Sequence, residues 1–305
     1  FNNLTGKNAN LDKNYLGLFP SVFLSYDIGE NDNQLLLNYS RRINRPRSWF
    51  LIPFSSYNDN RNQFFGNPDL DPEYTNSFEL GYAIQKKKFT INPTLYYKKT
   101  TGETQFVVTR ESSTSENFVT RPYNIGTETS YGLDLNFTAD ITSWYKVLGS
   151  VDLFGYKSEG TFDDPTLVSN PIDFSGDGFS TRLRLTNTFK IDKTMSFQVQ
   201  GFYRGGEKTT FQDRKSMYAI NFGANKTILN GDGTITFNIQ DIFNTRARNV
   251  TSFGDGFERE SYNQWNPRQF SVGFTYRFKQ GEKIDTKKRT KDINNNATGE
   301  EEGPM

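Results

Sequence analysis

The chain has 305 residues, a formal net charge of +1 and a mean hydropathy of −0.73, so it lacks the strongly basic surface of a nucleic-acid-binding protein. It contains neither cysteine nor histidine, which excludes disulfides, thiolate metal sites and a Ser-His-Asp hydrolase built from this chain alone. No apolar run reaches the roughly 18 residues that a transmembrane helix needs.

Aromatic residues make up 15% of this hydrophilic chain, with 28 Phe and 16 Tyr. A transmembrane barrel combines these properties, because lipid-facing apolar residues alternate with polar residues that face the lumen. The sequence therefore predicts an all-β fold, a transmembrane antiparallel up-and-down β-barrel. The chain starts without Met or an apolar leader, and we expect it to be a mature fragment or a cut domain.

Period-two alternation of apolar and polar residues predicts about 11 strands, each long enough to cross a bilayer. The last of them shows the pattern well, since Phe270, Val272, Phe274, Tyr276 and Phe278 share one face. In chain order the predicted strands are 17–28, 34–43, 75–85, 88–100, 128–140, 145–156, 179–191, 194–204, 215–228, 233–243 and 262–278.

Short and long connections alternate along the chain, which is typical of an outer-membrane barrel. The "NGDG" stretch at 230–233 is a hairpin signal, because Asn-Gly and Asp-Gly adopt positive φ easily. The other short turns are expected at 29–33, 85–88, 142–144 and 192–194. The long loops are expected at 43–75, 101–127, 157–178, 204–215 and 244–262.

An odd number of strands does not close a standard bacterial barrel, and an open sheet would leave two unpaired edges in lipid. Two interpretations remain: the chain is part of a larger barrel, or the barrel closes with ten or twelve strands. The first is preferred. Residues 279–305 are charged and nearly free of large apolar residues, so we expect a disordered polar periplasmic tail, with a docking segment as the alternative.

The stretch "GNPDLDPE" at 66–73 predicts a rigid loop. Pro68 and Pro72 lack amide donors and restrict the residues before them. We expect this loop mainly to brace its neighbours. Its carboxylates Asp69, Asp71 and Glu73 are candidate ligand contacts, but their spacing matches no full calcium loop, and we expect no metal site and no cofactor.

Aromatic residues near the outer strand ends are expected to form an interfacial girdle rather than a stacking surface for a ligand. These are Tyr123, Phe253, Phe257, Tyr262 and Trp265. Trp49 and Tyr57 lie farther from a strand and are better ligand candidates. On the polar faces of two strands, Arg182, Arg184 and Arg204 are expected to face the lumen, where they contact a plug, an anionic ligand or water.

The run "INRPRSWFLIPF" followed by "GNPDLDPEYTNSFELGY" resembles the barrel of TonB-dependent outer-membrane receptors, most closely the Bacteroidetes-type branch. The stretches "YLGLFPSVFLSYDI" and "FSVGFTYRF" are similar to that family too. The resemblance implies that residues 1–278 form the C-terminal half of a barrel of about 22 strands in the outer membrane of a Gram-negative bacterium. The plug domain, and the TonB box that binds the TonB protein, lie outside this sequence.

The resemblance also implies a function, the import of a scarce nutrient such as a siderophore or a glycan, without covalent chemistry. The expected partners are the lipid bilayer, the plug, TonB, a small-molecule or oligomeric ligand and a possible surface lipoprotein. The alternatives are a passive porin-like or scaffolding barrel and, less favoured because histidine is missing, an outer-membrane enzyme.

Overall fold

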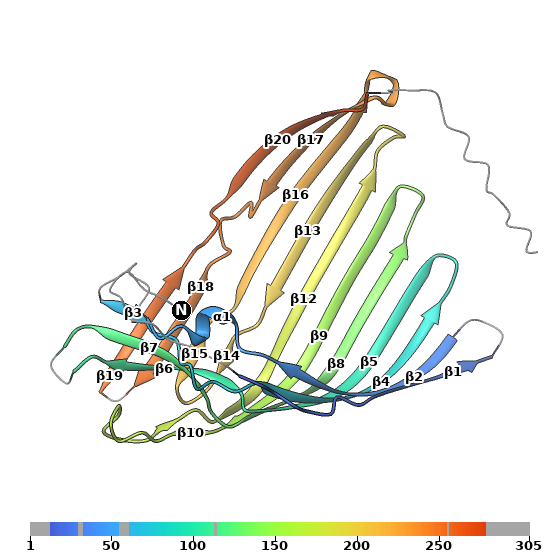
Figure 1. Ribbon diagram of the computed structural model, residues 1–305. Helices are drawn as coiled ribbons and strands as arrows, with labels where there is room; N and C mark the ends of the chain where they lie inside the picture. Colours follow the sequence, from blue (N-terminus) through green and yellow to red (C-terminus); the bar gives the residue numbers. More distant parts are fainter. Residues whose placement is uncertain (1–12, 30–32, 55–60, 113–114, 255, 279–305) are drawn as a thin grey trace, which may run out of the picture.

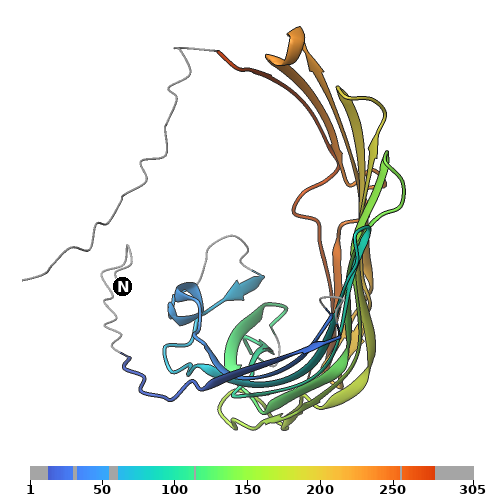
Figure 2. The same cartoon turned by 90° about the vertical axis from the view of Figure 1, so that its right-hand side faces the viewer.

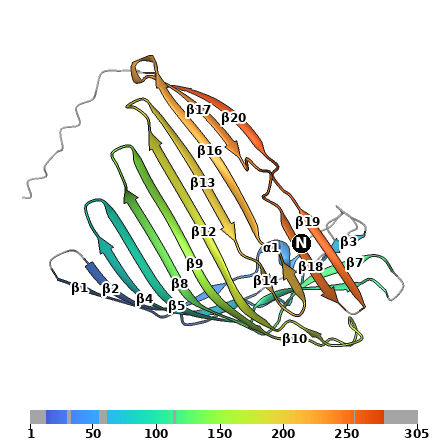
Figure 3. The ribbon, with the colours of Figure 1, turned by 180° about the vertical axis from the view of Figure 1, so that it is seen from behind.

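One large antiparallel sheet dominates the computed structural model, which describes residues 13–29, 33–54, 61–112, 115–254 and 256–278. Its eleven strands are hydrogen-bonded in sequence order, and Figures 1 and 3 show the same sheet from opposite sides. They are β1 (Ser21–Ile28), β2 (Asn33–Asn44), β4 (Glu73–Gln85), β5 (Phe89–Thr101), β8 (Thr127–Asp140), β9 (Tyr145–Glu159), β12 (Gly176–Lys190), β13 (Met195–Arg204), β16 (Met217–Ile228), β17 (Gly233–Gln240) and β20 (Gln269–Tyr276).

The eleven predicted strands are confirmed, and the long loops and short turns lie at opposite ends of the sheet (Figure 1). The predicted and observed strand boundaries differ most at the last strand of the sheet, which was expected to start at residue 262. The sheet strand β20 starts at Gln269, and the preceding segment forms a separate loop strand, β19 (Phe257–Asn263). Pro267 lies between them and cannot donate a ladder hydrogen bond.

The outer face of the sheet is apolar because the alternation keeps its register from strand to strand. Leu37 opposes Leu80, Leu80 opposes Leu95, and the row continues through Leu133 to Leu153. Leu37 and Leu95 are 52% and 57% exposed. A row of five leucines, four of them exposed, would be costly in water but suits contact with lipid chains.

A proline interrupts the ladder inside the sheet. The pairing of β4 with β5 runs to Gly81–Thr94 and resumes at Ile84–Ile91. Pro93 lies in the gap and has no amide to donate. On its other side Pro93 keeps its place opposite Leu135 of β8, so the strand continues without a change of register.

The long loops carry short strands of their own, which turn-rich composition did not predict. Two small sheets have the orders β14-β15-β18-β19 and β3-β7-β6, and β10 pairs with β11. The additional elements are α1 (Ser48–Leu51), β3 (Asn62–Phe64), β6 (Thr104–Arg110), β7 (Phe118–Asn124), β10 (Thr161–Phe162), β11 (Ile172–Asp173), β14 (Glu207–Lys208), β15 (Gln212–Arg214), the 3-10 helix η1 (Leu229–Gly231) and β18 (Arg248–Gly254). No helix among the described residues is long and apolar enough to cross a membrane.

The loops also have a hydrophobic core, which we call the loop core. It consists of Val107, Val108, Ile125, Phe162, Ile172, Phe174 and Phe211, which come from different long loops. Tyr123 and Phe257 pack against it, so the expectation of an interfacial girdle is wrong for these two rings. Apolar side chains brought together by several loops bury one another and shield each other from water.

Figure 2 shows the sheet bent into an arc, with α1 and the strands β3, β6 and β7 inside it. On β9, Phe154, Tyr156 and Ser158 share the parity of the polar Asp152 and are buried. The polar face of the sheet is therefore the concave one, and the loops cover it near the long-loop end.

We predict that Phe174→Ala loosens the long loops. Phe174 is 3% exposed and its ring centroid lies 4.4 Å from that of Phe211, so truncation leaves a cavity that costs about 3–5 kcal/mol. Limited proteolysis of the folded protein in detergent should cut the loops faster. Phe243→Ala, which removes a ring that is already exposed, is the matched control, and equal cleavage rates for both variants would refute the role of the loop core.

Candidate functional site

A ladder of charged side chains crosses four neighbouring strands on the concave face. Asp134 of β8 lies opposite Asp152 of β9, Asp152 opposite Arg182 of β12, and Arg182 opposite Arg204 of β13. Each of these residues occupies a polar position of its alternating strand, so the pairing register alone brings them side by side. Like charges directly opposite each other destabilise a sheet unless other groups compensate them.

The predicted lumen residues Arg182, Arg184 and Arg204 come together in one cavity of about 510 Å³, which Asp134 and Asp152 also line. The three arginines come from two adjacent strands. The structure therefore groups, on the concave face of the sheet, the three cations that were predicted to face the lumen.

Asp152 is the central acceptor of this cavity. Arg182 Nη1 lies 3.3 Å from Asp152 Oδ2, and Tyr96 donates its hydroxyl to Asp152 Oδ1 at 2.8 Å. The Arg182 guanidinium also lies over the Phe154 ring, 4.3 Å from its centroid. These contacts orient Arg182 and leave Arg184 and Arg204 without a share of the Asp152 carboxylate.

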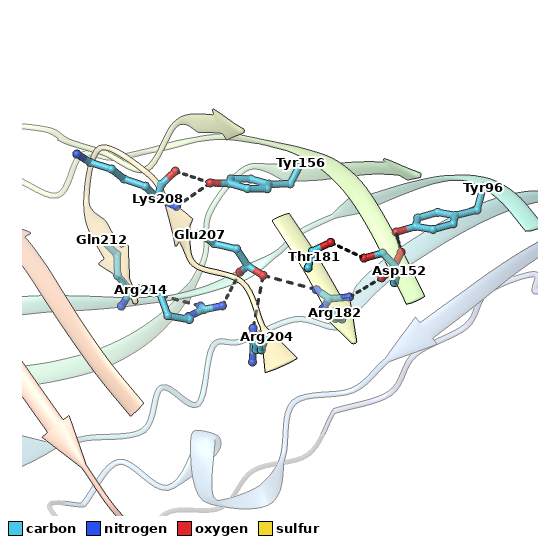
Figure 4. Close-up of polar contacts among 10 residues, drawn as sticks. All are labelled: Tyr96, Asp152, Tyr156, Thr181, Arg182, Arg204, Glu207, Lys208, Gln212 and Arg214. Carbon is cyan, nitrogen blue, oxygen red and sulfur yellow. Dashed lines mark hydrogen bonds and ion pairs between the residues drawn. The ribbon is translucent and has the colours of Figure 1, made fainter. Parts of the chain in front are cut away.

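Sequence analysis missed Glu207, which lies in the long loop after β13 and contacts Arg182 and Arg204 (Figure 4). Its carboxylate pairs with Arg214, and Arg182 Nη2 and Arg204 Nη2 lie 3.6 and 3.7 Å from its Oε1. Glu207 lies in a polar loop stretch that resembles many others in this chain, so no local signal distinguishes it.

The "GNPDLDPE" loop is held by specific side-chain bonds. Asn67 Oδ1 accepts from the amide of Asp69 at 2.9 Å, and Asn67 Nδ2 donates to Pro122 O at 3.1 Å. Asn124 Oδ1 accepts from the amide of Asp71 at 2.8 Å, while Asn124 Nδ2 donates to Asp71 O at 2.9 Å and to Gly102 O at 2.7 Å. The loop is thus fastened to the β6–β7 hairpin.

Close packing explains other features of this loop. A Cβ at Gly66 would lie 2.4 Å from the carbonyl oxygen of Ile52, so a side chain there would force the two segments apart. Leu70 is fully buried. Glu73 uses both oxygens, accepting from Asn44 Nδ2 at 2.8 Å and from the Thr104 amide at 2.9 Å.

The structure separates the remaining predicted contacts. Asp71 has a side chain that is 75% exposed, with Lys13 Nζ at 3.6 Å. Asp69 lines a cavity of about 690 Å³ at the long-loop end, together with Arg121 and Asp164. Trp49 is half exposed and lies in an aromatic group with Phe50, Phe64 and Phe106. Tyr57 lies outside the described residues.

No group of three or more acidic side chains able to hold a metal occurs in the part of the chain that the structure describes. Some acidic side chains hold turns. Asp173 Oδ1, for example, accepts from the amide of Ser175 at 2.9 Å.

Two carboxyl groups meet at the base of the β6–β7 hairpin. Burial of Glu103, followed by its hydrogen bond with Glu128 and the negative charge there, raises the pKa of Glu103 to about 8. The charge of Glu73 acts in the same direction, and a hydrogen bond from Gln105 opposes it. Near neutral pH Glu103 therefore keeps its proton and uses it to donate a hydrogen bond to Glu128.

Comparison with known proteins agrees with the fold of the large antiparallel sheet. A family model described as the outer membrane protein beta-barrel family matches residues 2–276. No curated protein sequence matches the chain significantly.

Solved structures with a similar fold include a copper transporter, OprC, with 14% identity and a TM-score of 0.55 over 84% of this chain and 39% of that one. The siderophore receptor PirA from Pseudomonas aeruginosa matches with 13% identity and a TM-score of 0.55 over 85% and 41%. A ferric enterobactin receptor from the same species, solved with enterobactin, matches with 12% identity and a TM-score of 0.51 over 85% and 40%. The chain spans about two fifths of the length of these proteins.

We predict that Asn124→Ala releases the "GNPDLDPE" loop. The substitution removes three hydrogen bonds to backbone groups of the loop and hairpin and should lower local stability by about 1–3 kcal/mol. Hydrogen exchange of residues 66–73 should accelerate. Asn117→Ala, which removes an exposed bond to Glu111, should leave that exchange unchanged, and an equal effect of both variants would contradict the assignment.

We also predict a pH dependence at the hairpin base. Because the pKa of Glu103 is higher in the folded chain, its stabilising contribution is complete below about pH 4.5 and is lost as the pH rises through about 8. Amide exchange at 102–104 should therefore rise from pH 7 to 9 more in the wild type than in Glu103→Gln, whose amide always carries a donor. Comparing the variants at each pH cancels the intrinsic rate. Glu111→Gln, at an exposed carboxylate of the same hairpin, should behave like the wild type.

Proposed function

Since this chain belongs to the outer membrane protein β-barrel family, we propose that it is part of a plugged barrel that actively imports a scarce nutrient into a Gram-negative bacterium. The barrel lies in the outer membrane, and its fold is that of TonB-dependent receptors. Active import, the plug and the nutrient are parts of the proposal.

The observation that carries the proposal is the folded loop assembly at one end of the sheet. Three long connections supply the loop core, and Phe257 packs against it from a fourth. Residues of three long connections line a cavity of about 690 Å³, a volume within the usual range for small-ligand sites. A passive pore needs an open mouth, whereas selective capture needs a shaped and rigid one. We place this end outside the cell, where a ligand arrives first.

Within this model the predicted contact residues have two roles. Glu73 and the backbone of the "GNPDLDPE" loop brace the assembly through Asn44, Thr104 and Asn124. Asp69, at the larger cavity, and the half-exposed Trp49 are proposed as ligand contacts. Asp71 faces outward and is assigned to the rim.

The proposed partners follow from the import mechanism. A plug domain fills the lumen, and TonB supplies energy by pulling on that plug. A surface lipoprotein that delivers a glycan would dock at the long-loop end. The ligand itself is proposed to be small or oligomeric, such as a siderophore complex or a glycan.

Energy dependence tests this function. Cells that express the full-length protein should be compared with cells that lack it, using radiolabelled ferric siderophore complexes and fluorescent oligosaccharides. We expect uptake of one class to require the protein and to stop with a protonophore, while binding to the cell surface persists. Uptake that continues with the protonophore and rises linearly with concentration would overturn active import and favour a passive pore.

A further inference from the structure

Three arginines converge on one carboxylate at the boundary between the concave face and the loops (Figure 4). Arg182 and Arg204 come from the wall strands β12 and β13, Arg214 comes from the loop strand β15, and Glu207 of β14 lies among them. We call these three side chains the arginine cluster.

The arginine cluster has more positive charge than its neighbours neutralise. Glu207 supplies one negative charge to three guanidinium groups, and Asp152 pairs with Arg182 alone among them. Arg184 lines the same cavity. The buried Nε of Arg204 has no hydrogen-bond partner among the described residues, which is unusual for a buried donor.

The surplus charge is open to the lumen. The side chains of Arg182 and Arg204 are 52% and 41% exposed, whereas that of Glu207 is 19% exposed. The cavity of about 510 Å³ lies beside both wall arginines. An anion in this cavity can therefore reach the guanidinium groups of Arg182 and Arg204, which Glu207 also contacts.

Glu207 belongs to a loop segment that hydrogen bonds attach to β9 and β12. The Tyr156 hydroxyl accepts from the amide of Lys208 at 2.6 Å and donates to its carbonyl at 3.1 Å. Gly205 lets the chain approach β12, since a Cβ there would lie 2.6 Å from Ser180 Oγ. The β14 pairing with β15 covers two residue pairs, Glu207–Arg214 and Lys208–Asp213, and the amides of Gly205 and Thr210 donate to Thr181 O and Ser175 O at 2.7 and 2.8 Å.

We propose that the arginine cluster is a binding site for the anionic groups of the imported ligand, and that Glu207 occupies it as an internal counter-ion until such a group displaces it. Guanidinium groups bind carboxylates and phosphates through paired charge-assisted hydrogen bonds, which suits a ligand with two or more anionic groups. Displacement would move the Glu207 side chain, while the hydrogen bonds of Gly205 and Lys208 keep the backbone of β14 in place. This inference rests on the proposed import function and narrows its ligand to a multivalent anion.

Binding to the purified full-length protein in detergent tests the site without transport. The probes are tricarballylate, a small tricarboxylate, and its neutral triamide, measured by isothermal titration calorimetry. Tricarballylate should bind the wild type, more weakly as salt rises, and the triamide should not. Glu207→Gln removes the internal competitor and should tighten tricarballylate binding about tenfold, and adding Arg204→Gln should cancel that gain.

Asp213→Asn is the matched control, because it removes the same charge from the same hairpin but at a side chain paired with Lys215 at 2.8 Å. It should leave the affinity unchanged, and heat-modifiable migration should confirm that every variant is folded. A wild type and a Glu207→Gln variant that both fail to bind, or a gain as large in Asp213→Asn, would overturn the proposal. Energy-dependent uptake of a neutral ligand would then leave the import function intact, whereas anion binding without energy-dependent uptake would refute import alone.

Discussion

Backbone hydrogen bonding in the absence of water is the constraint on which the rest of this structure depends. Inside the hydrocarbon layer each amide and carbonyl must find its partner in the protein, and the chain achieves this with eleven strands that pair with their neighbours in sequence order. Nearest-neighbour antiparallel pairing then requires the connections to alternate between the two ends. The connections at one end of the sheet can be short polar turns, while those at the other end are free to be long. The position of the loop assembly follows from that alternation.

Each strand of the sheet has one apolar face and one polar face. Side chains of one parity form the leucine row from Leu37 to Leu153, and those of the other form the charged ladder from Asp134 to Arg204. A slip of one residue would exchange the two sets. The charged ladder is consequently positioned by the same pairing that satisfies the backbone. Like charges that meet across strands are compensated by Tyr96 of β5 at Asp152 and, from outside the large sheet, by Glu207 at Arg182 and Arg204.

The long loops behave as a folded unit because several of them contribute apolar side chains that no single loop buries alone. Phe174 and Phe211 lie 37 positions apart in the numbering, and their rings are in contact in the loop core. The "GNPDLDPE" loop is fastened by Asn124, more than 50 residues away. Such contacts explain why turn-rich composition understated the order in these segments, and why Tyr123 and Phe257 pack inward instead of joining an interfacial girdle.

Alternation and turn residues were enough to identify the eleven strands and the parity that places Arg182, Arg184 and Arg204 on the polar face of the sheet, because a period of two is a local property of the chain. The two prolines and Gly66 likewise identified a rigid loop at 66–73, since their effect on the backbone is local. The pairing of Arg182 with Arg204, the approach of Glu207 and the loop core were decided only by the tertiary structure. They depend on strand register and on contacts between segments distant in the sequence, and no short stretch of residues encodes which distant partner it will meet.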